Sequence, residues 1–143
     1  MRVMVLVKAN DDSEAGIMPA LELIEAMGAF NEELVKAGVM LDGDGLKPSS
    51  EGVRIEFDGP TKRNVVDGPF AETKELVAGY WVWQVKDMDE AVEWARRCPN
   101  PTGQHGTLEI RPFFEASDWE GHVPPETLAQ EERLRAEVAS QQS

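Results

Sequence analysis

Two segments of the chain carry apolar side chains at nearly every position rather than at every second one. Residues 3–7 are Val-Met-Val-Leu-Val, and residues 79–85 are Gly-Tyr-Trp-Val-Trp-Gln-Val. Short runs of this kind, rich in β-branched and aromatic residues, predict β-strands. Because neighbouring side chains of a strand point to opposite faces, both faces of these two strands must be covered in the folded protein.

Two further segments have the 3.6-residue periodicity of surface helices. Residues 19–37 place apolar side chains on one side and glutamates on the other, and Gly38 ends the segment. Asn31 interrupts the apolar side, and we expect a backbone group to satisfy its amide. The second helix follows Asp87, which is a suitable N-cap, and Glu90 three residues later predicts a capping box.

The remaining strands complete a split β-α-β arrangement. Residues 39–41 and 107–111 are predicted strands, and residues 53–66 alternate apolar and charged side chains around an Asp-Gly-Pro turn, which indicates a hairpin. The order β-α-β-[hairpin]-β-α-β predicts an α+β fold, the ferredoxin-like sandwich with an antiparallel sheet. In that sandwich both helices cover the same face of the sheet.

The second face of the sheet then needs another cover, because the strands at 3–7 and 79–85 are apolar there as well. A homodimer with twofold symmetry, in which two sheets pack face to face, is the simplest solution. Polar side chains on this inner face would line a cavity shared by the two subunits. The candidates are Tyr80, Gln84, Glu109 and Arg111.

Composition limits the classes of function. The 143 residues suit one ordinary domain, and 27 acidic against 14 basic residues give a net charge of −13. This charge argues against nucleic-acid and anionic-membrane partners, which require basic surfaces, and the longest apolar run is too short to span a bilayer. One cysteine and two histidines exclude an internal disulfide and leave little for a metal site. We therefore expect a cytoplasmic protein with no cofactor and no metal.

The chain changes character near residue 113. We expect the domain to span residues 1–115 and an acidic tail to follow over residues 116–143. Pro124 and Pro125 are suited to begin a short polar helix that runs to about Val138. The few large apolar residues of this segment predict a loosely docked tail.

One string of residues resembles a known family. Asp67-Gly-Pro-Phe70, followed by Ala71-Glu-Thr-Lys-Glu75 and Gly79-Tyr-Trp81, is similar to the YCII-related proteins of the DGPF-domain type. Supporting strings are Met27-Gly-Ala-Phe-Asn31, Gly45-Leu-Lys-Pro-Ser49, Arg97-Cys-Pro99 and Glu109-Ile-Arg-Pro112. The resemblance covers about residues 1–115, and its strings are specific in combination, whereas the DGPF string alone is a weak signal.

The resemblance implies a dimeric α+β barrel, a bacterial origin and a largely uncharacterised function. Some relatives look like small enzymes that act through a histidine–aspartate pair in the barrel cleft. Others are encoded beside, or fused to, extracytoplasmic-function sigma factors. This chain departs from many DGPF members by carrying Lys47 where they have histidine or glutamine, and His105 and His122 stand at no motif position.

Two carboxylates are the candidate catalytic residues. Asp67, desolvated beneath Phe70, would accept a hydrogen bond from a ligand or remove a proton. The alternative is a structural turn, in which the aspartate bonds its own backbone and Gly68 supplies a positive φ. Glu72 would pair with Asp67 as a two-carboxylate site, or would belong to a solvated loop.

The candidate ligand-binding residues are Lys47, Gly68, Phe70, Tyr80, Glu109 and Arg111. Lys47 and Arg111 would hold a small anionic ligand, or would neutralise Glu109 and its neighbours across the dimer. Trp81 and Trp83 are expected in the core rather than as a stacking platform for a ligand.

Three functions fit these residues. The first is a small-ligand-binding protein or weak enzyme, with a cleft at the dimer seam that holds Asp67, Glu72, Tyr80 and Arg111. The second is a non-catalytic regulatory module associated with an extracytoplasmic-function sigma factor, which predicts an exposed apolar patch outside the seam. The third is a structural dimer without a ligand. The sequence thus selects a fold without selecting a reaction.

Overall fold

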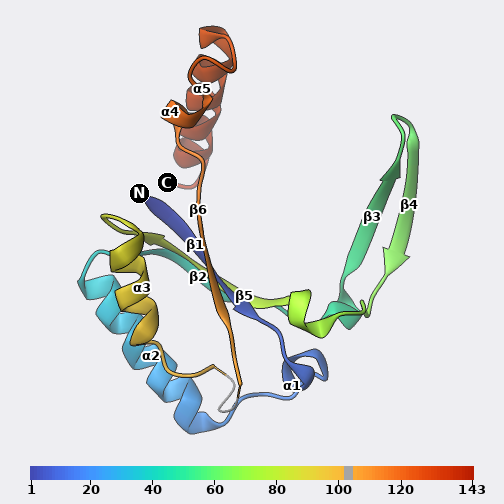
Figure 1. Cartoon of the computed structure of the whole chain (residues 1–143), viewed down its shortest axis with the longest axis vertical. Coiled ribbons are helices and arrows are strands. Elements are labelled where there is room, and N and C mark those ends of the chain that lie inside the picture. Colours follow the sequence, from blue (N-terminus) through green and yellow to red (C-terminus); the bar gives the residue numbers. More distant parts are fainter. Residues whose placement is uncertain (102–104) are drawn as a thin grey trace. The chain divides into compact units, whose positions relative to one another are not determined.

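The structure, a computed structural model, describes residues 1–101 and 105–143. The chain forms two compact units, Met1–Pro112 and Phe113–Ser143. The larger unit is built on a four-stranded antiparallel sheet in the order β2-β5-β1-β6 (Figure 1). Its strands are β1 (Arg2–Lys8), β2 (Met40–Gly45), β5 (Val77–Gln84) and β6 (Leu108–Pro112).

Two helices, α2 (Leu21–Lys36) and α3 (Met88–Arg96), cover one face of this sheet (Figure 1). Their buried residues Phe30, Leu34 and Ala91 pack with odd-numbered side chains of β1 and β5. The strand residues of this core, with one residue that precedes β2 and one that follows β5, are Val3, Val5, Val39, Trp81, Trp83 and Val85. The strand order and the placement of both helices confirm the ferredoxin-like α+β fold that the sequence predicts.

Aromatic rings fill the centre of the core. Trp81 and Trp83 are 6% and 0% exposed, as predicted, and Phe30 meets both edge-on, with ring centroids 5.9 and 6.4 Å away. The indole Nε1 of Trp81 donates a hydrogen bond to Asn31 Oδ1 at 2.9 Å. The prediction that a backbone group would satisfy Asn31 is therefore wrong. A Cβ at Gly43 would lie 2.7 Å from Trp81 Cδ1, so the packing of the indole requires glycine on the neighbouring strand.

The start of α3 follows its sequence signal only in part. The Asp87 side chain accepts a hydrogen bond from the Glu90 backbone N–H at 2.9 Å, which is the predicted N-cap. The Glu90 carboxylate accepts from the backbone N–H of Lys86 at 2.6 Å rather than from that of Asp87, so the reciprocal capping box is not closed. Beyond the helix, burial raises the pKa of the Cys98 thiol to about 11, which keeps it protonated at neutral pH.

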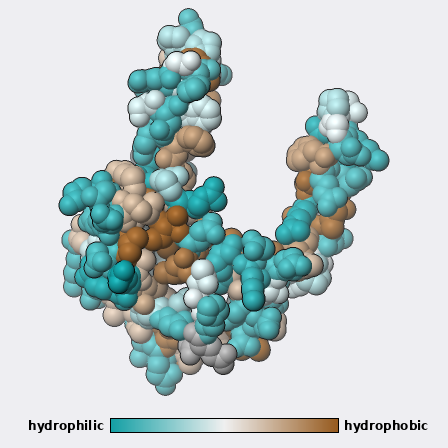
Figure 2. Space-filling view, in the orientation of Figure 1, coloured by the Kyte–Doolittle hydropathy of each residue, from teal (hydrophilic) through white to brown (hydrophobic). Residues whose placement is uncertain are grey.

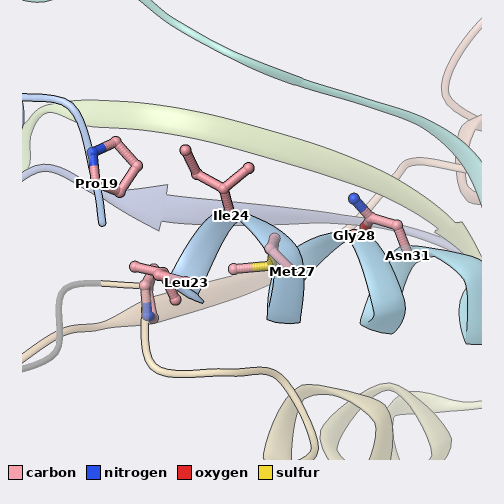
Figure 3. A pocket seen from close by; sticks show the side chains of 7 residues that line it. Pro19, Leu23, Ile24, Met27, Gly28 and Asn31 are labelled. Atoms are coloured by element: carbon pink, nitrogen blue, oxygen red, sulfur yellow. The ribbon is translucent and has the colours of Figure 1, made fainter. Parts of the chain in front are cut away.

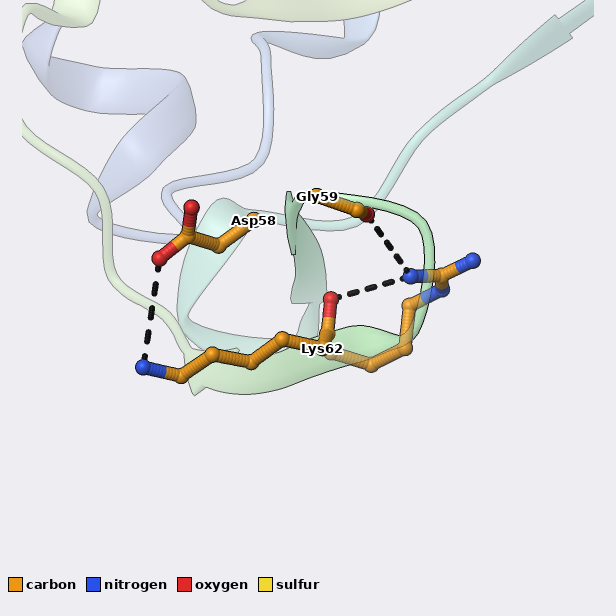
Figure 4. Close-up of polar contacts among 4 residues, drawn as sticks. Asp58, Gly59 and Lys62 are labelled. Carbon is orange, nitrogen blue, oxygen red and sulfur yellow. Dashed lines mark hydrogen bonds and ion pairs between the residues drawn. The ribbon is translucent and has the colours of Figure 1, made fainter.

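The predicted hairpin is present as a separate two-stranded sheet of β3 (Val53–Asp58) and β4 (Lys62–Asp67). Polar contacts hold its tip, where Lys62 pairs with Asp58 at 3.9 Å and the Arg63 guanidinium donates to the Gly59 carbonyl oxygen at 3.4 Å (Figure 4). One face of the hairpin is apolar and exposed, and Figure 2 shows hydrophobic atoms along it. The large apolar residues of that face are Val53, Ile55, Phe57 and Val65.

Short helical segments connect these elements. They are α1 (Asp11–Glu14), η1 (Ser49–Glu51) and η2 (Thr73–Glu75). The second unit contains α4 (Ala116–Trp119) and α5 (Pro125–Gln141), so the short polar helix predicted to begin at the Pro124-Pro125 pair is present and extends three residues past Val138. Within the described residues, none of the helices combines the length and the apolar character that a membrane span requires.

Candidate functional site

The face of the sheet opposite α2 and α3, here called the open face, carries a half-buried apolar floor. Strand alternation places Met4 and Leu6 of β1 on this face, together with Tyr80 and Val82 of β5, and all four side chains are half-buried. The strand register then sets their neighbours on the same face. Leu6 stands opposite Tyr80 on one side and Glu109 on the other, and Met4 stands between Val82 and Arg111.

Tyr80 supplies a polar group at the β2 side of the open face. Its phenol donates a hydrogen bond to Asp42 Oδ2 at 3.3 Å. The negative charge of Asp42 is the largest cause that raises the pKa of Tyr80, followed by desolvation, the hydrogen bond to Asp42 and the charge of Asp44. The phenol therefore stays protonated at neutral pH and acts as a hydrogen-bond donor.

Arg111 and Glu109 supply charges at the β6 side. Arg111 Nη1 lies 3.5 Å from Glu109 Oε2 in an exposed ion pair. Arg111 thus pairs with Glu109 within one chain, whereas one of the two alternatives predicted from the sequence was neutralisation of Glu109 across the dimer. An exposed pair of this kind contributes little to stability, and a guanidinium has five N–H donors, so the pairing leaves Arg111 able to bind an acceptor as well.

The Asp-Gly-Pro-Phe string forms a tightly held turn at the base of the hairpin. The Gly68 backbone N–H donates to the Gly52 carbonyl oxygen at 2.9 Å, and the Phe70 backbone N–H donates to Ser49 Oγ at 3.0 Å. Ser49 is itself fixed by the Glu14 carboxylate, which accepts from its backbone N–H at 2.9 Å and from its hydroxyl at 2.5 Å. The Gly68–Pro69 peptide bond is cis.

The two candidate catalytic carboxylates lie next to this turn, and both are exposed in the single chain. The desolvation of Asp67 beneath Phe70 expected from the sequence is thus not a property of one chain; the half-buried Phe70 ring instead carries the Arg54 guanidinium, 3.9 Å from its centroid. Glu72 has a backbone φ of 63°, in the left-handed region, and precedes η2. A catalytic role for Asp67 or Glu72 stays a prediction.

The structure separates the candidate ligand-binding residues into two groups. Tyr80, Glu109 and Arg111 share the open face, whereas Gly68 and Phe70 belong to the turn at the hairpin base. Lys47 is exposed just before η1, and its Nζ lies 3.9 Å from Glu51 Oε1. The two cations expected to hold an anionic ligand, Lys47 and Arg111, therefore each have a carboxylate partner in the same chain.

The described part of the chain has a groove along α2 and a smaller pocket at the end of β1. The groove, of about 430 Å³, follows one side of α2, and Figure 3 shows that Leu23, Ile24 and Met27 project along it, which makes it mainly apolar. The smaller pocket, of about 200 Å³, lies where the end of β1 meets η2 and the segment before β6. Its described lining is Lys8, Ala9, Asn10, Asp11, Thr73, Lys74, His105, Gly106 and Thr107.

This small pocket was not predicted from the sequence. In the sequence, Lys8 ends an apolar strand and Lys74 belongs to the string after the DGPF motif, and neither position indicates a pocket. The lining comes from three separate segments, so sequence spacing carries no signal for it. Among the described residues, no three His, Cys, Asp or Glu side chains are arranged to hold a metal ion.

We expect Gly68→Ala to disrupt the turn at the hairpin base. A Cβ at position 68 would lie 1.7 Å from the backbone oxygen of Ser49, so η1 or the turn must move. The expected cost is about 1–3 kcal/mol of unfolding free energy, the usual range for an overpacked site, measured by denaturant titration. The matched control is Gly45→Ala, because a Cβ there meets nothing within 4 Å. Equal stability of both variants would contradict a tightly packed turn.

Comparison with known proteins places the chain in a family. The family model described as the YCII-related domain matches residues 1–117, and the chain belongs to this family. An uncharacterised protein of Rhizobium meliloti (strain 1021) is 31% identical over 107 residues, which are 73% of this chain and 86% of that protein.

The chain is also similar, at lower sequence identity, to a solved structure. It is 5-chloro-2-hydroxyhydroquinone dehydrochlorinase from Burkholderia phenoliruptrix AC1100 in complex with 2,5-dihydroxybenzoquinone. The match has a TM-score of 0.47 and 13% sequence identity, and it covers 82% of this chain and 98% of that one.

Proposed function

We propose that this protein binds a small molecule on the open face of its sheet, in a cleft that a second copy of the chain completes. The observation that carries the proposal is the composition of that face. An apolar floor that includes Leu6 and Val82 lies between a phenol donor, Tyr80, and the Glu109–Arg111 ion pair. Apolar walls with a few well-placed polar groups are the usual character of ligand sites.

A second copy is the simplest cover for this floor. Both central strands, β1 and β5, present apolar side chains on the open face, and α2 and α3 already occupy the opposite one. Burial of apolar surface contributes roughly 25 cal/mol per Å² of stabilisation, so packing two such faces together favours the dimer. With twofold symmetry, the polar groups beside the floor then surround a cavity shared by two subunits.

The polar groups define which ligand fits. The phenol of Tyr80 donates a hydrogen bond and Arg111 offers a cationic fork, so both favour oxygen acceptors on the ligand. The floor between them favours a flat or aliphatic body. The ligand class is therefore a small anionic molecule with an apolar body and oxygen acceptors.

A protein-binding role is the second candidate, because the hairpin exposes an apolar face that includes Ile55 and Phe57, 47% and 69% exposed. Such a patch suits contact with another protein. Association with an extracytoplasmic-function sigma factor stays a prediction of the sequence analysis, without a structural observation behind it.

A thermal-shift screen of small carboxylic acids and phenols tests the proposed site. We expect hits that raise the melting temperature of the protein and that lose about fivefold in affinity in Tyr80→Phe, which removes one hydroxyl and keeps the ring. If Tyr80→Phe and Arg111→Gln both bind the hits with the affinity of the wild type, the ligand binds elsewhere and the proposal is contradicted. A screen without hits would favour the structural dimer without a ligand.

A further inference from the structure

The small pocket at the end of β1 gathers positive charge in a strongly acidic chain. Its cationic side chains are those of Lys8 and Lys74, and His105 lies beside them. Asp11 is the one acidic residue among the described residues of the lining. The chain as a whole has a net charge of −13. A pocket with two lysines against one aspartate therefore differs in sign from most of the surface, and it favours an anion.

Hydrogen bonds between the three segments fix the shape of this pocket. The backbone N–H of Lys8 donates to the Thr107 carbonyl oxygen at 3.1 Å, and that of Ala9 donates to the Leu76 carbonyl oxygen at 2.9 Å. Lys8 Nζ also donates to the Glu75 carbonyl oxygen at 3.3 Å, which holds the ammonium group beside η2. The backbone of the lining is thus held in place, which lowers the entropy cost of ordering it when a ligand binds.

The pocket continues the open face at one end. Lys8 follows Leu6 by two positions on β1, and Thr107 precedes Glu109 by two, so alternation puts both at the end of the face that carries Tyr80. The irregularity in the ladder at Val7/Lys8 falls on the β5 side, where Lys8 pairs with Val77 and Ala78 is passed over. The β1 alternation therefore runs without a break into the pocket.

The size of the pocket limits what it holds. Its volume of about 200 Å³ is below the roughly 300–1,000 Å³ of sites that enclose a whole drug-sized ligand. One oxyanion group, a carboxylate or a phosphate, suits this space and finds ammonium and hydroxyl donors there from Lys8, Lys74 and the threonines Thr73 and Thr107.

We propose that the pocket of Lys8, Lys74 and His105 binds the anionic group of a small carboxylate or phosphate ligand whose apolar body lies on the open face. The inference rests on the proposed function for the position of that body, whereas binding of the anionic group depends on the pocket alone. It also assigns the anion to cations different from Lys47 and Arg111, the pair expected from the sequence.

Three probes test the inference by two-dimensional NMR titration of the full chain. Inorganic phosphate has the charge without an apolar body, benzoate has both, and benzamide is the neutral analogue of benzoate. We expect phosphate and benzoate to shift the amide signals of Thr73, Lys74 and Gly106, benzoate to shift that of Leu6 as well, and benzamide to bind at least tenfold more weakly than benzoate.

Charge variants show whether the pocket itself binds the anion. Lys8→Gln and Lys74→Gln are each expected to weaken phosphate and benzoate binding about tenfold, the effect of one charge-assisted hydrogen bond. Asp11→Asn removes the opposing negative charge and is expected to strengthen the binding of phosphate and of benzoate. A variant with a damaged fold would not bind them more tightly. The matched control, Lys62→Gln at the hairpin tip, is expected to leave both affinities unchanged.

The outcomes separate this inference from the proposed function. Phosphate binding that depends on Lys8 and Lys74, without any benzoate shift at Leu6, supports the anion pocket and contradicts the ligand site on the open face. Benzoate and benzamide binding with equal affinity at Leu6, unaffected by Lys8→Gln and Lys74→Gln, overturns the anion pocket and leaves the proposed function intact. No phosphate or benzoate shift at Thr73, Lys74 or Gly106 also overturns the inference.

Discussion

Replacing Leu6 by aspartate is expected to dissociate the proposed dimer into monomers. Leu6 lies in the middle of the open face, between Tyr80 on β5 and Glu109 on β6. In the proposed dimer a carboxylate at this position would be buried against the partner's sheet and close to Glu109. Burial of an unpaired charge costs several kcal/mol, so we expect the dimer dissociation constant to rise by at least about a hundredfold.

Sedimentation velocity at micromolar concentration measures this change. The wild type is expected to sediment at the mass of two chains and Leu6→Asp at the mass of one. The matched control is Leu134→Asp, because Leu134 is already 45% exposed on α5 in the other unit and its replacement should leave the dimer intact. A wild type that sediments as a single chain would remove the dimer and the shared cleft with it.

The Trp83→Ala substitution is expected to cost about 3–5 kcal/mol of unfolding free energy. Trp83 is fully buried, and its ring centroid lies 6.4 Å from that of Phe30 and 5.7 Å from that of Trp81. Its removal leaves a large cavity between the sheet and the helices, which close packing elsewhere cannot fill. Since domains of this kind are stable by only about 5–15 kcal/mol, a large part of the stability is lost.

Urea denaturation followed by circular dichroism gives the free energies to compare. Trp119→Ala is the control, because Trp119 is 42% exposed in α4 and packs against Phe114, whose ring centroid lies 4.8 Å away. We expect this control to cost less than about 1 kcal/mol. A Trp83→Ala cost no larger than that of Trp119→Ala would mean that the sheet–helix interface is not the core of the protein.

The fold was predictable because its signals are local and repeated. The continuous apolar runs at residues 3–7 and 79–85, the helical periodicity after Pro19 and the N-cap at Asp87 each depend on a few neighbouring residues. The same local signals predicted the hairpin and the helix after Pro124, whereas the structure shows that the hairpin is a separate sheet. They were less accurate where a partner comes from elsewhere in the chain. Asn31 meets the Trp81 indole, fifty residues away, and no sequence pattern points to that contact.

The candidate site was predictable only in part for the same reason. Alternation alone puts Tyr80, Glu109 and Arg111 on one face of the sheet, and the structure has them there. The motif string was a poorer guide to geometry, because Asp67 and Glu72 are exposed beside a turn whose backbone is held by Gly52 and Ser49. A short string can match the family in sequence without indicating where its side chains point. It therefore identifies the family better than it locates a site.

By itself the sequence determined the strands of the sheet and the hairpin, the helices α2, α3 and α5, the apolar second face of β1 and β5, and the membership of the YCII-related family that the family model shows. The short helices α1 and α4 were not predicted. Only the tertiary structure decided which charges stand together. It pairs Arg111 with Glu109 and Lys47 with Glu51, and it brings Lys8, Lys74 and His105 to one pocket from three distant segments. Periodicity is a property of neighbouring residues, which the sequence displays directly. An electrostatic site depends on the distances between charged groups of separate segments, and these distances are set only when the chain has folded.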